Sequence, residues 1–196
     1  MSKGIELSRE RTAVMCMDYQ NAIVAAYTGA GQEELVSRAS RVLEHARSRG
    51  IRVIYIHVGF RPGFPEVSSR NMLFSAIKSS PERQKMFEGG GSEIHASVAP
   101  EDGDIVIMKH RVSAFTGTDL EMVLRANDID TLALFGIATS GVVLSTLVDG
   151  ADRDYRLFVI KDCCEDTDGE LHSCLINKYF TKRGTVITAD DFINAG

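Results

Sequence analysis

Short, near-continuous apolar runs alternate with longer amphipathic stretches along most of the chain. Uninterrupted apolar runs of this length are typical of strands in a parallel sheet, because both faces of such a sheet are covered. The pattern therefore predicts a series of buried strands, the last of them short. They cover residues 12–17, 51–58, 104–108, 131–135, 155–160 and 185–187.

Several of the stretches between these runs carry apolar residues at helical spacing. The clearest covers residues 33–49 and is followed by Gly50, which is placed to close it. Another is expected over residues 142–152. Two more are expected to begin at a capping box, in which a Thr and a Glu three residues later bond the free amides of the first turn. These boxes are Thr118 with Glu121 and Thr167 with Glu170.

Strands that alternate with helices are joined by right-handed crossovers, which predicts a doubly wound, Rossmann-like α/β fold. Its mostly parallel sheet would have helices on both faces. No internal repeat or low-complexity tract is visible, and 196 residues suit one domain with a sizeable core. We therefore expect residues 1–196 to form a single domain.

The least regular stretch covers residues 59–103. It holds all four prolines and the run Gly89–Gly91, with one short helix expected over residues 72–77. So long a connection within a compact domain is usually functional. We interpret it as covering the site of its own subunit or packing on a partner subunit, and both alternatives stay open.

Composition excludes several classes of partner. The chain is 44% hydrophobic and 25% charged, with a net charge of −5, as in ordinary globular proteins. This charge gives no electrostatic case for binding nucleic acid or an anionic membrane. No apolar run approaches the roughly 20 residues that span a bilayer. Residues 1–11 lack the apolar core of a signal peptide, so a cytoplasmic location is expected.

The cysteines, at positions 16, 163, 164 and 174, are expected to be free thiols in a reducing compartment. They lack C-x-x-C spacing, and no matching pair of histidines accompanies them. We therefore expect no metal site and no cofactor.

Charged residues and a tight turn follow three of the predicted strands. Asp18 follows the first, Lys109 the third, and residues 137–142 connect the fourth to its helix. In open α/β sheets, ligands bind at the carboxyl ends of the strands, where helix amino ends present N–H groups. Asp18 and Lys109 would form a pair that burial tunes for proton transfer. Taken singly, Asp18 is more typical of a helix cap and Lys109 of a solvated loop.

Four segments carry a family resemblance, the most specific having the pattern Lys-x-x-x-Ser-x-Phe-x-x-Thr-x-Leu. They are Asp18-Tyr-Gln-Asn21, Lys109 to Leu120, Gly136-Ile-Ala-Thr139 and Tyr155 to Cys163. On these segments the chain resembles the isochorismatase-like (cysteine hydrolase) superfamily, which includes nicotinamidases, N-carbamoylsarcosine amidases and isochorismatases. The resemblance runs through nearly the whole domain.

The resemblance implies a homodimer or larger oligomer and, as in the amidases, an Asp–Lys–Cys triad. By motif position, Asp18 matches the general base, Lys109 the charged partner and Val142 the cysteine. It also implies a cis peptide at Ile137–Ala138, which would aim backbone N–H groups at a substrate oxyanion. The residues expected to contact the substrate are Gln20, Phe60, Phe64, Ile137, Ala138, Thr139, Ser140 and Gly141.

Nicotinamidases carry an Asp-x-His…His metal site after the second strand. The corresponding region here reads Tyr55-Ile-His57, with one His and no Asp beside it. His57 is therefore interpreted as a residue of the pocket wall or the core, since a stable site needs at least three ligands.

Valine can neither attack a substrate nor donate a proton, so the expected chemistry starts from Asp18. The leading hypothesis is hydrolysis of a small molecule by non-covalent acid–base catalysis through Asp18, with Lys109 orienting the substrate. Isochorismatases cleave a vinyl ether in this way without a cysteine. A second hypothesis is a catalytically inactive small-molecule-binding or scaffold protein. A third is an amide hydrolase that uses Ser140, Thr139 or an activated water.

Overall fold

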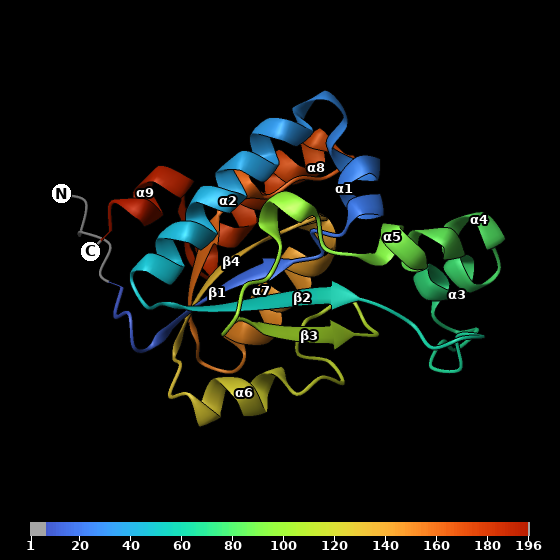
Figure 1. Ribbon diagram of the computed structural model, residues 1–196, viewed down its shortest axis with the longest axis horizontal. Coiled ribbons are helices and arrows are strands. Elements are labelled where there is room, and N and C mark those ends of the chain that lie inside the picture. Colours follow the sequence, from blue (N-terminus) through green and yellow to red (C-terminus); the bar gives the residue numbers. More distant parts are fainter. Residues whose placement is uncertain (1–6, 196) are drawn as a thin grey trace.

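The computed structural model describes residues 7–195. The cytoplasmic location was expected from residues 1–11, and residues 1–6 of these lie outside the described part. A six-stranded sheet has the order β3-β2-β1-β4-β5-β6, and all neighbouring strands run parallel. This confirms the predicted doubly wound α/β fold (Figure 1). The strands are β1 (Thr12–Met17), β2 (Arg52–Val58), β3 (Ile105–Lys109), β4 (Thr131–Gly136), β5 (Arg156–Ile160) and β6 (Thr185–Ile187).

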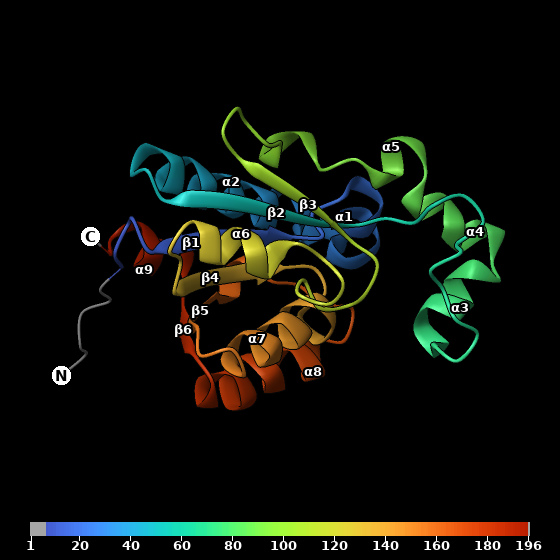
Figure 2. The ribbon, with the colours of Figure 1, turned by 90° about the horizontal axis from the view of Figure 1, so that it is seen from below.

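Helices cover both faces of the sheet. α2 packs along one face against β1 and β2, and α7 packs along the other against β5 (Figure 2). Within residues 7–195, no helix has the length and apolarity to cross a membrane. The helices are α1 (Asn21–Thr28), α2 (Gln32–Ser48), α3 (Met72–Lys78), α4 (Pro81–Gln84), α5 (Gly89–Ser92), α6 (Leu120–Ala126), α7 (Leu144–Ala151), α8 (Gly169–Cys174) and α9 (Ala189–Ile193).

The predicted end of α2 is confirmed, because Gly50 follows it in the left-handed region with φ of 69°. The two predicted capping boxes are wrong. The Thr118 hydroxyl donates to the Ala114 carbonyl and accepts from the Leu120 N–H at 3.3 Å. The Glu121 side chain bonds Arg125 instead of completing a box with Thr118, and Asp119, the residue at the cap of α6, makes no side-chain cap bond. The cap of α8 is Asp168, one residue after the predicted Thr167. The Asp168 carboxylate accepts from the Leu171 N–H at 2.9 Å.

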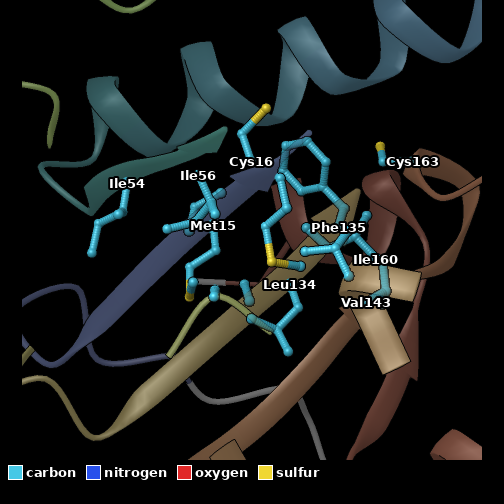
Figure 3. Packing of buried hydrophobic residues seen from close by; sticks show 14 of the residues in the cluster. Met15, Cys16, Ile54, Ile56, Leu134, Phe135, Val143, Ile160 and Cys163 are labelled. Atoms are coloured by element: carbon cyan, nitrogen blue, oxygen red, sulfur yellow. The ribbon is translucent and has the colours of Figure 1, made fainter. Parts of the chain in front are cut away.

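β1 and β4 form the centre of the core, and every residue in both strands is buried. Figure 3 shows Met15, Ile54 and Leu134 in this packing. The carboxyl ends of β1 and β4 approach each other so closely that a Cβ on Gly136 would lie only 2.6 Å from the Met17 carbonyl oxygen. Only glycine, which has no Cβ, fits at this position without a shift of the backbone. This approach sets Asp18 beside the turn that follows β4.

Residues 59–103 are named the projecting segment, because α3, α4 and α5 within it lie beyond the carboxyl edge of the sheet (Figures 1 and 2). The end of the segment returns along α2 to the start of β3. The expected short helix is present as α3. α4 and α5, which were not predicted, follow it. Ser80 caps α4 by accepting from the Arg83 N–H, and Pro81 occupies its first turn.

Candidate active site

Asp18 and Lys109 form a buried ion pair at the carboxyl edge of the sheet. Lys109 Nζ lies 2.9 Å from Asp18 Oδ2, and the two side chains are 3% and 8% exposed. Asp18 directly follows β1 and has a φ of 58°, in the left-handed region that aspartate adopts more readily than most residues. Because β2 lies between β1 and β3, Lys109 spans the end of β2 to make this contact. The predicted pairing of these strand ends is confirmed.

The second carboxylate oxygen of Asp18 has no partner. Asp18 Oδ1 is buried and accepts no hydrogen bond from the described residues. Burial raises the pKa of the Asp18 carboxyl above its ordinary value, while the Lys109 ammonium and the nearby Val58 N–H oppose this. Such a group can hold a proton or accept a hydrogen bond from a bound molecule.

The turn after β4 begins with a cis peptide between Ile137 and Ala138, as predicted. A wide helical turn over Thr139–Val143 then leads into α7. The Ile137 N–H donates to the Met17 carbonyl at 3.1 Å, which holds the turn against the end of β1. Val142, from the same turn, is 2% exposed.

Two of the turn amides are bonded inside the protein. The Thr139 N–H donates to the Glu165 carbonyl at 2.9 Å, and the Ser140 N–H donates to Asp166 Oδ2 at 2.7 Å. A carboxylate is favourable at the amino end of a helix. The buried Asp166 carboxylate therefore takes the place predicted for a substrate anion at the Ser140 N–H, and the Glu165 carbonyl occupies the Thr139 N–H.

A cavity of about 370 Å³ opens at this edge, a volume near the lower end of the roughly 300–1,000 Å³ typical of small-molecule sites. Its floor is formed by the strand ends and the turn, and one wall is formed by the projecting segment. The floor consists of Asp18, Lys109, Ile137, Ala138, Gly141 and Val142. The wall consists of Leu73, Phe74, Ile77, Arg83, Met86 and Phe87.

Gln20 was predicted to contact the substrate but lies outside the cavity lining. Its Nε2 donates to the carbonyls of Val58 and Ser92 at 3.0 and 2.9 Å, and its Oε1 accepts from the Val58 N–H at 2.8 Å. The side chain is thus fully occupied. It ties the end of β2 to the end of α5 and so fastens the projecting segment to the sheet.

Thr139 and Ser140 also lie outside the lining, unlike the neighbouring Ile137, Ala138 and Gly141. The Thr139 hydroxyl instead bonds His172 Nδ1 of α8 at 2.8 Å. The turn therefore presents its apolar residues to the cavity and directs its hydroxyls elsewhere.

Phe60 and Phe64 lie behind the wall and do not form part of it. Their rings stack at 4.9 Å between centroids. The Phe60 ring also contacts Phe74 and Phe87 edge-on, each at 5.4 Å. Phe60 thus supports two aromatic residues that face the cavity, and Phe64 stacks on Phe60.

The sequence did not indicate the polar residues that complete the lining, Tyr27, Arg83 and Thr167. Tyr27 comes from α1, and burial raises the pKa of its phenol, so this hydroxyl keeps its proton. Two signals could have located these helices. Ser80-Pro81 marks the start of α4, and Ile23 lies one helical turn before Tyr27.

No cysteine contributes to the cavity lining within residues 7–195. Cys16 and Cys163 are buried in the core (Figure 3). Cys164 contacts the Ile160 carbonyl oxygen through its sulfur at 3.4 Å, and burial raises the pKa of this thiol to about 12. It therefore remains a thiol, a poor nucleophile, at neutral pH.

Among the described residues, no group of three or more His, Cys, Asp or Glu side chains is placed to hold a metal ion. His57 is half-buried in β2 and does not line the cavity. Burial lowers the pKa of its imidazole, and the charge of Lys109 lowers it further.

Comparison with known proteins gives the chain its family. A family model described as the isochorismatase domain matches residues 12–191. The chain belongs to the isochorismatase family. Its relatives include YecD of Escherichia coli O157:H7, an uncharacterized isochorismatase family protein that is 29% identical over 97% of this chain and 99% of its own length.

A second relative is the ureidoacrylate amidohydrolase RutB of Azorhizobium caulinodans, which is 31% identical over 97% of this chain and 92% of its own length. Among solved structures, an isochorismatase family protein from Burkholderia thailandensis has a TM-score of 0.85 at 25% identity, over 98% of both chains. The resemblance seen in the sequence is confirmed, and with it the assignment of this chain to a family of hydrolases.

Proposed function

We propose that this protein hydrolyses a small molecule by acid–base catalysis at Asp18, without a covalent intermediate. The observation that carries the proposal is the arrangement of the Asp18 carboxyl. One oxygen pairs with Lys109, and the other is buried without a partner in a residue that lines the cavity. A raised pKa favours the protonated form, which can give its proton to a substrate.

In the proposed reaction, the Asp18 carboxyl donates its proton to the substrate, and the bond to the leaving group breaks. A water molecule adds to the carbon that loses this group. The same water gives a proton back to Asp18, which restores the acid. Lys109 stabilises the carboxylate that exists between the two transfers. The net change is the addition of one water across one bond.

The composition of the floor supports a route without a covalent intermediate. Val142 occupies the position that the family resemblance assigns to a thiol, and its side chain offers only methyl groups. Among residues 7–195, neither a cysteine nor a serine is part of the cavity lining. The hypothesis of an amide hydrolase that uses Ser140 or Thr139 loses support, because both lie outside the lining.

A second candidate is hydrolysis of a carbon–nitrogen bond by a water that Asp18 activates as a base. The relative RutB is named an amidohydrolase, which favours this bond type. The two roles of Asp18 differ in their pH dependence. Activity falls as pH rises through the Asp18 pKa if the residue acts first as an acid, and rises if it acts first as a base.

The test is turnover of a panel of small amides, esters and vinyl ethers by the wild type, Asp18→Asn and Cys164→Ser. We expect Asp18→Asn to lose activity by about 10²–10⁴-fold, the usual contribution of a general acid or base. Cys164→Ser should retain activity, because the thiol is outside the cavity. Full activity in Asp18→Asn contradicts the proposal. Absence of turnover throughout the panel contradicts it too, and favours a binding protein.

A further inference from the structure

The Asp18–Lys109 pair stands in a cavity whose other lining residues are mostly apolar, including Ile137, Ala138 and Val142 of the floor. The floor carries the Asp18–Lys109 pair, whereas five of the six wall residues are apolar. A molecule that fills the cavity therefore meets the charged pair at one place on the floor, and hydrocarbon over most of the remaining surface. This division restricts which class of substrate fits.

Arg83 is the charged residue of the wall. It is exposed, and among the described residues its guanidinium makes no ion pair or hydrogen bond. Arg61 of the same segment differs, because it pairs with Glu66 at 3.0 Å. An unpaired guanidinium at the edge of an apolar site suits a carboxylate, which it can bind through two parallel hydrogen bonds.

The charges of the lining point to a ligand with one negative charge. Arg83 is the charged residue of the lining outside the Asp18–Lys109 pair, and among the described residues its guanidinium has no ion-pair partner, so one carboxylate would neutralise it. The unpartnered Asp18 Oδ1 adds a need for a hydrogen-bonding group, which accepts from the protonated carboxyl or donates to the carboxylate. One acid group at Arg83 and one hydrogen-bonding group at Asp18 would satisfy both needs.

The apolar part of the wall favours a hydrocarbon body. Phe74 and Phe87 present aromatic surface to the cavity and are held from behind by Phe60. Burial of apolar surface against such a wall contributes roughly 25 cal/mol per Å². A small polar acid gains nothing from this surface, whereas an aromatic ring gains both burial and ring contacts.

We infer that the substrate is an organic acid with a single carboxylate and an aromatic or branched hydrocarbon body. Its carboxylate pairs with Arg83, its body packs on the wall, and its reacting bond lies at Asp18. The location of the reacting bond rests on the proposed function. The binding of the acid and of its body does not.

Calorimetric titration with three probes tests the inference without any turnover. Hydrocinnamate has both the ring and the carboxylate, hydrocinnamide has the ring alone, and propionate has the carboxylate on a short chain. We expect hydrocinnamate to bind at least about tenfold more tightly than either of the others, since each loses one of the two contacts.

Matched variants assign each contact to its residue. Arg83→Gln should weaken hydrocinnamate binding by about tenfold and leave hydrocinnamide unchanged. Arg70→Gln removes the same charge from an exposed residue outside the lining and should change neither. Leu73→Ser should weaken hydrocinnamate binding several-fold, whereas Met72→Ser should not, because Met72 is 87% exposed and is not part of the lining.

Equal affinity for hydrocinnamate and propionate, or for hydrocinnamate and hydrocinnamide, overturns the inference. So does an equal loss in Arg83→Gln and Arg70→Gln. The titrations are repeated with Asp18→Asn to separate the two proposals. Probe binding as expected, without hydrolysis of any panel compound by the wild type, contradicts the proposed function alone. Turnover that hydrocinnamate does not inhibit contradicts the inference alone.

Discussion

The floor and the wall of the cavity are built in different ways. The floor stands on the ends of buried strands, and its two charged side chains are 8% and 3% exposed. The wall comes from α3, which has 7 residues, and α4, which has 4, and from the turn after them, and one of its members, Leu73, is 55% exposed. The sheet therefore fixes the chemical groups, while short, partly exposed elements supply the surface that selects the substrate.

The largest expected effect separates the two regions by stability. Lys109→Met leaves Asp18 buried without its counter-charge, which should lower the free energy of unfolding by about 3–5 kcal/mol. Arg83→Gln in the wall should change it by less than about 0.5 kcal/mol, as is usual for exposed residues. Urea unfolding of both variants measures the difference. Similar losses in the two would mean that the floor is not the more tightly built region.

The loss in Lys109→Met should also depend on pH. The folded-state pKa of Asp18 is raised, so between the ordinary value and the raised one the folded protein binds more protons than the unfolded chain. Stability therefore falls as pH rises through this window. Without the opposing ammonium, the window extends to higher pH. The loss should be larger at about pH 8 than at about pH 5, and an equal loss at both would contradict this account of Asp18.

A smaller effect is expected where the two regions are joined. Gln20→Leu removes three hydrogen bonds, to Val58 and Ser92, and leaves their backbone groups without these partners. We expect a loss of about 1–3 kcal/mol in the free energy of unfolding. Faster proteolysis within the projecting segment should accompany it. Gln32→Leu, at the start of α2, is the matched control and should show neither change.

The smallest expected effect concerns the turn of the floor. Asp166→Asn keeps the size of the side chain but removes the negative charge that bonds the Ser140 N–H, at a cost of about 1 kcal/mol. Asp168→Asn, two residues later, should be nearly neutral, because asparagine caps a helix as well as aspartate does. Thermal unfolding of the two variants measures both. Equal losses would show that the charge at the turn has no special role.

The same division explains how much could be predicted from the sequence. Strand limits followed from apolar runs, and the observed β1 and β6 have the predicted bounds. Asp18 and Lys109 were found because each stands at the end of such a run, where the topology of a parallel sheet brings strand ends to one edge. The positions of Asp18 and Lys109 at the ends of predicted parallel strands therefore indicated the charged pair of the floor.

The wall had no comparable signal. Its helices are too short for apolar periodicity to show which face is buried. Phe60 and Phe74 are equally aromatic in the sequence, and tertiary packing alone places Phe74 in the cavity and Phe60 behind it. The cap of α8 was missed for a related reason. Thr167 and Asp168 are both good caps, and the choice depends on where the chain leaves the preceding loop.

The central claim is that the floor holds a carboxyl that keeps a proton more readily than an ordinary aspartate. NMR titration of the Asp18 side-chain carboxyl carbon measures this directly and requires no substrate, with Asp18→Asn identifying the resonance. The account predicts a midpoint above the ordinary value of 3.8. A midpoint at or below that value would make Asp18 a plain ionic partner of Lys109 and would contradict its role as the proton donor.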